Sequence, residues 1–284
     1  MKVNQQYLEG ITETKIFSSE NEIEVCNIAS LVLPSFVDLT GKFDFKSFYI
    51  ATKILVHNLN KISKLSTHPT QTASFGNLSY RPIGISVQGL ADLFIDLKLP
   101  FNSNTARELN RYIAETLYHA ALEASCEIAE TTGPCHRFYD SPTSMGQLQF
   151  DIWGIDLQSL SFNWDALRFK IKRHGLANSL LVAYMPTTGT TQITGCSEAC
   201  EPVMRHVYVS FSCSWFLMWI YSNFYTRRIL SGESNVISTR LVECLEELQL
   251  WSPFMRDKIL EDKGTFLLFG SQIPYLQYKA LYKR

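Results

Sequence analysis

The first candidate functional residues are four threonines and one glycine at positions 187–191, which offer O–H and backbone N–H donors. They follow a short apolar run at 180–184, and Pro186 ends that run because proline has no N–H to donate to a neighbouring strand. Converging O–H and N–H donors at the end of a buried strand suit a phosphate, whose oxygens accept several hydrogen bonds. The same composition is typical of a threonine-rich surface turn, so the pattern alone leaves both interpretations open.

Seven cysteines form the second group of reactive residues, at positions 26, 126, 135, 196, 200, 213 and 244. They include no Cys-x-x-Cys pair, and their spacing to the histidines does not indicate a metal site, so we expect no bound metal. The opening residues lack the apolar centre of a signal peptide, which favours free thiols in a cytoplasmic protein. Cys26 lies in an apolar run at 25–33, where a small packing residue and a redox thiol are both open interpretations.

Alternating helices and strands are predicted to position these residues. The apolar runs at 25–33 and 180–184 predict buried strands, and 83–97 runs into a helical pattern. Segment 63–80, rich in Ser, Thr and Pro, is predicted to be a loop, and 1–22 an irregular segment. The remaining helices are predicted from their caps: 44–62 after Asp44, about 102–131 from Asn102 and Ser103, 164–174 after Asn163, and two more after Ser238 and Ser252.

Composition and charge limit the classes of function. The chain has 284 residues, of which 46% are hydrophobic, enough for one large domain or two small ones. The 26 basic and 27 acidic residues balance, so no overall field favours nucleic acid or an anionic membrane. The uncharged stretch at 207–221 is too short for a helix to cross about 30 Å of hydrocarbon comfortably. It predicts a buried strand or helix, an interfacial anchor, or sequence foreign to the domain.

Seven sequence blocks, in this order, carry a resemblance to a known family: Val25-Cys-Asn-Ile-Ala-Ser-Leu31, Asn58-Leu-Asn-Lys-Ile62, Arg81-Pro-Ile-Gly-Ile-Ser-Val-Gln-Gly-Leu-Ala-Asp92, Ala120-Ala-Leu-Glu-Ala-Ser-Cys126, Asn178-Ser-Leu-Leu181, Met185-Pro-Thr187 and Tyr225-Thr-Arg-Arg-Ile-Leu-Ser-Gly-Glu233. Together they resemble the large, catalytic subunit of class I ribonucleotide reductase, across about 12–255. The third block is long and specific, which makes a chance resemblance untenable.

The resemblance implies an α/β fold: the second, incomplete half of a ten-stranded α/β barrel. Residues 1–22 would be an altered finger-loop region and 23–284 a partial barrel domain, with an apolar insertion at 203–221. The family reduces ribonucleoside diphosphates to deoxyribonucleoside diphosphates by a thiyl radical, a glutamate base and a cysteine pair. By this resemblance Cys26 stands at one reducing-cysteine position and Glu13 at the base position.

In the family, a Pro-Thr-x-x-Thr turn binds the substrate diphosphate. The matching residues here are Thr187, Thr188, Gly189 and Thr190. Gly189 stands where a hydroxyl residue is common, so one side-chain donor is missing. The resemblance implies no cofactor in this chain, but a metal-containing, radical-generating small subunit and ATP or dNTP effectors bound to an N-terminal half. It further implies a large-subunit dimer and a thioredoxin- or glutaredoxin-type reductant, with no nucleic acid and no membrane.

Departures from the family pattern affect the expected activity. Counted back from Cys26, the finger-loop motif of the family, Asn-Leu-Cys-x-Glu, falls on residues 9–13. The radical-cysteine position of the motif is occupied by Ile11, which has no S–H bond. Only Glu13 agrees with the motif. We therefore expect a fragment or degenerate copy of the reductase large subunit that is inactive alone. The alternative is a non-catalytic partner that regulates an intact subunit. We further hypothesise that the insertion at 203–221 is translated intervening sequence or a gene-model error, which sequencing of the mature transcript across codons 202–222 would decide.

Overall fold

The computed structural model describes residues 23, 25, 27–68, 70–155, 162–201, 205–209, 222–229, 232–237, 239–247 and 249–261. The chain divides into two compact units. The first consists of Met1–Leu31, Phe43–Val87 and Leu109–Pro186, and the second of Val32–Lys42, Gln88–Glu108 and Thr187–Arg284. Within the described residues, no helix combines the length and the apolar character that crossing a membrane requires.

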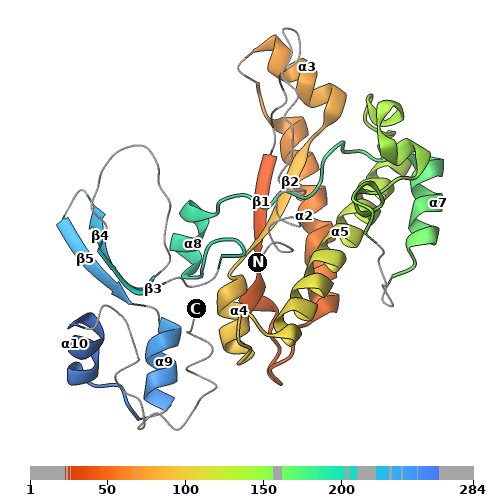
Figure 1. Ribbon diagram of the computed structural model, residues 1–284. Coiled ribbons are helices and arrows are strands. Elements are labelled where there is room, and N and C mark those ends of the chain that lie inside the picture. Colours follow the sequence, from red (N-terminus) through yellow and green to blue (C-terminus); the bar gives the residue numbers. More distant parts are fainter. Residues whose placement is uncertain are drawn as a thin grey trace. The chain divides into compact units, whose positions relative to one another are not determined.

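The first unit packs helices beside a small sheet. Its elements are most of β1 (Asn27–Val32), α2 (Phe45–Leu65), α3 (Gln71–Tyr80), β2 (Ile83–Gln88) except its last residue, most of α5 (Asn104–Thr132), α6 (Gln149–Ile152) and α7 (Trp164–His174), with 3-10 turns η2 (Phe138–Asp140) and η3 (Pro142–Met145). β1 and β2 are hydrogen-bonded neighbours, and the long helices α2 and α5 lie side by side (Figure 1).

Caps begin the helices where the sequence predicts them. The Asp44 carboxylate accepts from the Ser47 N–H, the Ser103 hydroxyl from the Ala106 N–H, and the Asn163 side chain from the Ala166 N–H. Each cap satisfies an N–H that has no partner within its helix. Gly133, at φ +80°, follows the end of α5, and Gly175, at φ +78°, ends α7. A left-handed backbone suits glycine at both positions.

The buried face of α2 includes polar residues. Phe48, Thr52 and Leu59 are buried, but Ile62 is 49% exposed. Val56, Asn60 and Ser63 complete the buried face. Near the end of the helix the residues that face the interior are therefore polar, and an apolar pattern does not identify them.

The predicted loop at 63–80 is wrong, because its second half forms α3. Thr70 caps the helix by accepting from the Ala73 N–H at 3.2 Å. The buried positions of α3 are Ala73, Gly76, Asn77 and Ser79. These small and polar residues give no amphipathic pattern, yet they allow close packing in the tertiary structure.

The two predicted buried strands are only partly realised. β1 forms at 27–32, but most of it is half-buried and Ile28 is 56% exposed. At 180–184 the chain makes a single parallel bridge, between Val182 and Ile85. The Ile83 and Ile85 N–H groups donate to the carbonyls of Leu180 and Leu181 at 3.0 and 2.8 Å. The segment at 180–184 therefore pairs in parallel with β2, while a continuous strand does not form there.

The second unit consists of η1 (Leu33–Phe36), α4 (Leu90–Asp96), α8 (Thr188–Thr194), β3 (Arg205–Val209), β4 (Ser222–Ile229), β5 (Gly232–Ile237), α9 (Thr239–Glu247) and α10 (Pro253–Glu261). β3 pairs parallel with β4, and β4 pairs antiparallel with β5. Of the uncharged stretch 207–221, residues 207–209 belong to β3, and 210–221 lie outside the described residues. Ser252 caps α10 as predicted, whereas Ser238 is not among the described residues.

Candidate functional site

The threonine-rich segment is the beginning of a helix and not a turn. Thr187 is the N-cap residue of α8, and Thr188, Gly189 and Thr190 form its first turn. The structure thus places the four predicted diphosphate-binding residues together on consecutive backbone positions. The first N–H groups of a helix have no acceptor within the helix, so they are able to donate to an anion.

The hydroxyls of this segment are partly used to hold it in place. Thr187 is 5% exposed, and its Oγ1 accepts from the Ala199 N–H at 2.9 Å. The Thr191 hydroxyl donates to the Thr187 carbonyl at 3.0 Å, and Thr191 is buried as well. These two threonines are therefore structural residues of α8. Gly189, by contrast, is exposed, and a Cβ added to it would meet no atom within 4 Å.

Gln88, the last residue of β2, connects to α8 through its side chain. Its Oε1 accepts from the Thr190 hydroxyl at 2.8 Å, and its Nε2 donates to the Thr194 hydroxyl at 3.3 Å. Gln88 is 2% exposed. The sequence analysis did not identify this residue, because the contact joins segments far apart in the chain.

The residues that follow Gln88 hold the loop after α8. Gly89, at φ +79°, donates its N–H to the Ser197 carbonyl at 2.8 Å, and Leu90 donates to Ala199 at 3.4 Å. A Cβ on Gly89 would come within 2.8 Å of the Pro34 ring. Glycine is therefore required here both for the backbone conformation and for the close approach. The long block at 81–92 and the threonine segment, which the resemblance identified separately, are thus bound to each other.

Asp92 extends this junction to α9. Its carboxylate accepts a short hydrogen bond from the Ser197 N–H, and Arg240 lies 3.5 Å from it while also pairing with Asp96 at 2.7 Å. Asp92 is 7% exposed. Burial raises the pKa of its carboxyl group, while Arg240 and the Ser197 N–H oppose that shift. A buried carboxylate with these partners anchors the loop and helix α9 to α4.

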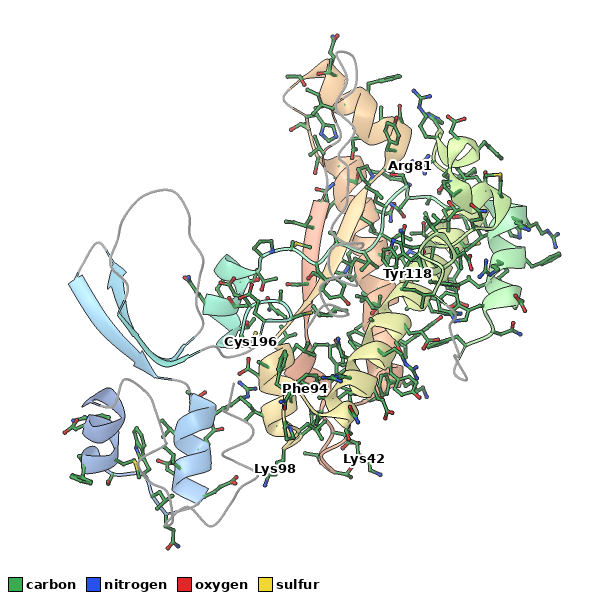
Figure 2. All side chains as sticks on the ribbon, viewed as in Figure 1. Lys42, Arg81, Phe94, Lys98, Tyr118 and Cys196 are labelled. Atoms are coloured by element: carbon green, nitrogen blue, oxygen red, sulfur yellow. The ribbon has the colours of Figure 1, made fainter. Side chains whose placement is uncertain are left out.

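Cys126, Cys135 and Cys196 are buried thiols, and Cys200 is half-buried. Cys196, in the loop after α8, lies 3.1 Å from the Thr194 hydroxyl (Figure 2). Burial raises the pKa of Cys196, and it raises the pKa of Cys126 and Cys135 to about 11. Burial raises the pKa of Cys200 to about 12. Since the thiolate is the reactive form, the raised pKa of each of these four thiols favours a packing role over a reactive one.

Three positions that determine the expected chemistry lie outside the described residues: Cys26, Glu13 and Ile11. Thr188 is described in its backbone only. Among the described residues no cluster of His, Cys, Asp and Glu could hold a metal ion.

A buried polar network in the first unit joins four of the resemblance blocks. Asn178, 1% exposed, exchanges hydrogen bonds with Asn60, accepts from the Ser125 hydroxyl at 2.9 Å and donates to the Arg81 carbonyl at 2.8 Å. Arg81 has a positive φ of 45°, which this contact helps to hold. Sequence analysis missed the network, although an Asn at an inward position of a predicted helix was a usable signal.

A second polar cluster joins α2 to α5. The Tyr49 hydroxyl donates to Glu123 at 2.8 Å and lies 2.8 Å from Nδ1 of His119, while Lys53 pairs with Glu123 and Glu127. One phenol hydrogen cannot serve both partners, so donation to Glu123 requires His119 to carry its hydrogen on Nδ1. Burial is the main cause that lowers the pKa of His119 to about 4, and burial also raises the pKa of Tyr49. His119 is therefore neutral near pH 7.

Aromatic rings close this cluster toward α7. His119 stacks on Phe162 at 4.3 Å between ring centroids and meets Trp164 edge to face at 5.0 Å. Tyr118, on the same helix, lies among densely packed side chains near α7 (Figure 2), 6.0 Å from the Trp164 ring. Burial raises the pKa of Tyr118 to about 12. This cluster therefore packs the helices against one another and presents no reactive group.

Comparison with known proteins identifies the family. The sequence profile described as "Ribonucleotide reductase, barrel domain" matches residues 12–217. The ribonucleoside-diphosphate reductase large subunit of Caenorhabditis elegans is 42% identical over 270 residues, covering 93% of this chain and 32% of the relative. The large subunit of Vaccinia virus is 43% identical over 270 residues, covering 93% and 33%. The large chain of Schizosaccharomyces pombe is 42% identical over 272 residues, covering 96% and 31%.

The chain thus spans about a third of the length of the relatives it matches. The alignments cover nearly all of it and include the junction of Gln88 and Asp92 with the threonine segment. The profile match, which extends over more than half of the chain, confirms the resemblance inferred from the sequence blocks. The chain belongs to the ribonucleotide reductase barrel-domain family.

Proposed function

We propose that this chain supplies the diphosphate-binding part of a ribonucleoside-diphosphate reductase large subunit. The observation that carries the proposal is the identity of 42–43% to proteins of that name over at least 93% of the chain. The alternative of a non-catalytic regulatory partner is not favoured, because the relatives reported above are all named as reductase subunits.

The proposed substrate group is the diphosphate of a ribonucleoside diphosphate. Backbone N–H groups of Thr188, Gly189 and Thr190 would donate to its oxygens, and Thr187 would fix the start of the helix through Ala199. Charge-assisted hydrogen bonds of this kind contribute roughly 1.5–3 kcal/mol each. Cys26 would occupy one redox-cysteine position and Glu13 the base position.

The finer architecture and the partners are part of the same proposal. The two units would belong to the second half of a ten-stranded α/β barrel, with residues 23–284 in the barrel domain and 1–22 as an altered finger-loop region. The remaining requirements would come from outside this chain: a metal-containing radical-generating small subunit, a second large subunit, ATP or dNTP effectors and a thioredoxin- or glutaredoxin-type reductant. We propose a cytoplasmic location for this assembly.

The residue at position 11 determines the expected activity. Isoleucine has no S–H bond from which a thiyl radical could form, so the radical step has no group at the position where the family carries it. We therefore propose that the chain binds the substrate diphosphate but does not reduce ribonucleotides by itself. Turnover by the purified chain, mixed with a competent small subunit and a dithiol, would overturn the inactivity.

The binding proposal is tested by calorimetric titration of the chain with CDP. We expect saturable binding that is weaker for CMP and absent for cytidine, because the contacts are made to the diphosphate. A Thr188→Pro variant removes one N–H donor, because proline has no backbone N–H. It should weaken CDP binding roughly tenfold. An Asn58→Ala variant, at an exposed position of α2, is the matched control.

Equal affinity of the chain for CDP and cytidine would contradict the proposal. So would unchanged CDP affinity in Thr188→Pro, provided that the variant unfolds at the same urea concentration as the parent chain.

A further inference from the structure

We propose that Gln88 is a positioning residue that holds the first turn of α8 in its binding geometry. The inference rests on the function proposed above for 187–190 and adds a residue from a different part of the chain. Gln88 would not touch the diphosphate. It would act through Thr190, whose backbone N–H belongs to the proposed binding turn.

Both ends of the Gln88 carboxamide are engaged by α8. Oε1 accepts from the Thr190 hydroxyl at 2.8 Å, and Nε2 donates to the Thr194 hydroxyl at 3.3 Å. These threonines are four residues apart, so they lie on one face of the helix in successive turns. One side chain therefore contacts two turns of α8 and fixes both its rotation and its position along the axis.

α8 depends on such contacts because it is short. It has seven residues, and a helix of this length is unstable without tertiary packing. Two of its exposed positions, Gly189 and Ile193, contribute little packing, since Ile193 is 87% exposed. The N-cap Thr187 is held by Ala199, and Gln88 holds the body of the helix.

Because Gln88 is buried, its position requires a neutral side chain with both a hydrogen-bond donor and an acceptor. Gln88 is 2% exposed, so a donor or acceptor left unpaired there would not be satisfied by water. A carboxylate in its place would accept from Thr190 but could not donate to Thr194, and it would add a negative charge beside a proposed diphosphate site. A neutral carboxylic acid would again provide one donor and one acceptor.

The first test uses the chain without any ligand. In Gln88→Leu, amide hydrogen exchange of the peptide covering 187–195 should accelerate roughly tenfold, the factor that corresponds to losing about one buried hydrogen bond. Peptides from the middle of α5 should exchange as in the parent chain. Unchanged exchange at 187–195 would overturn the inference, and so would equal acceleration throughout the protein.

The second test uses the conservative variant and a pH profile. Inorganic pyrophosphate is titrated into the parent chain, Gln88→Glu and Gln88→Leu at about pH 7 and about pH 5, and each affinity is divided by the parent value at the same pH. Burial raises the pKa of a glutamate, so the introduced acid should be largely protonated at the lower pH. Asp92, Arg240, Cys196 and Glu198 near this junction are present in every variant, so their titration cancels in the ratio.

We expect both variants to bind roughly tenfold more weakly than the parent at about pH 7. Only Gln88→Glu should recover at about pH 5, because only it regains a donor and an acceptor. The same loss in both variants at both pH values would overturn the positioning role in favour of general packing. Failure of the parent chain to bind pyrophosphate would count against the proposed diphosphate site. In that case the hydrogen-exchange experiment still decides whether Gln88 holds α8.

Discussion

Asn60 and Asn178 hydrogen-bond each other in both directions, with the Nδ2 of each donating to the Oδ1 of the other at 3.1 and 3.0 Å. The pair joins the middle of α2 to the segment that leads toward the threonine helix. Ser125 on α5 and the Arg81 carbonyl complete the network, so that it joins four segments in the interior of the first unit. A network in which each side chain is satisfied specifies one arrangement of these segments.

Asn178→Ala should therefore destabilise the chain by about 3 kcal/mol, because the Asn60 Oδ1, the Ser125 hydroxyl hydrogen and the Arg81 carbonyl each lose the bond to the Asn178 side chain. Urea denaturation gives the free energy of unfolding. Asn58→Ala, at an exposed position of α2, should change it by less than about 0.5 kcal/mol. A similar effect for both variants would show that the network contributes no more than an ordinary surface residue.

Gly76→Ala should destabilise the chain by more than about 1 kcal/mol, because the added methyl group overpacks the interior. Helix propensity alone would give the opposite result, since alanine stabilises a helix relative to glycine by about 1 kcal/mol. Gly76 is buried in α3, and an added Cβ would lie 2.7 Å from the backbone carbon of Ile23. The Ile23 N–H also donates to the Thr72 carbonyl at 3.2 Å, so this segment would have to leave α3. The free energy of unfolding from urea denaturation is again the measurement, with the exposed Gln71→Ala as control. Stabilisation by Gly76→Ala would refute the close contact.

The sequence was sufficient to predict features that depend on neighbouring residues. The caps Asp44, Ser103 and Asn163 could be predicted because a cap and the helix that it begins are adjacent in the chain. α3 could not be predicted, since small and polar side chains face the interior there and only the tertiary structure makes those positions buried. The same reason explains the segment at 180–184, where the number of backbone pairs depends on the geometry of a distant strand.

The candidate site also has some features that the local sequence predicts and others that it does not. The threonine segment was recognisable from composition and from the family resemblance. In the structure it begins helix α8, whose Thr190 hydroxyl donates to Gln88, a residue 102 positions away in the chain. The buried ion pair of Asp92 with Arg240 likewise joins positions that no local pattern relates. Most of the features that the sequence did not predict depend on contacts between residues far apart in the chain.

Acid should weaken the fold through His119. Burial lowers the pKa of His119 to about 4, whereas an exposed histidine in the unfolded chain titrates near 6.5. Between these values the unfolded state binds more protons, so stability is full above about pH 6.5 and is lost as the pH falls toward 4. This group contributes up to about 3 kcal/mol to that loss. His119→Gln should flatten the dependence of the free energy of unfolding on pH across this window.

His136→Gln, at an exposed position, is the matched control for this measurement. It should leave the slope as it is in the parent chain. A parent chain whose stability does not change between about pH 6.5 and pH 4 would contradict the burial of a neutral His119.

Arg240→Met should destabilise the chain by about 3 kcal/mol, because it leaves the buried Asp92 without its cationic partner. A double variant that adds Asp92→Asn should recover part of the loss, since the amide carries no charge to be compensated. Arg256→Met removes an exposed pair with Asp257 and should cost less than about 1 kcal/mol. The measurement is denaturant unfolding of five proteins: the parent chain, Arg240→Met, Asp92→Asn, the double variant and Arg256→Met. Additive losses in the double variant would mean that Arg240 and Asp92 do not interact.

Gly189→Ser should strengthen the binding of CDP, and comparison with Gly189→Ala isolates the reason. Nothing lies within 4 Å of an added Cβ, so both side chains fit, and both remove the cost of glycine in the helix. Only serine adds a hydroxyl donor at the position where the family commonly has one. A hydrogen bond to a charged acceptor is worth roughly 1.5–3 kcal/mol, so the serine variant should bind CDP at least about tenfold more tightly than the alanine variant. Calorimetric titration measures both constants, and equal affinities would show that the diphosphate does not reach position 189.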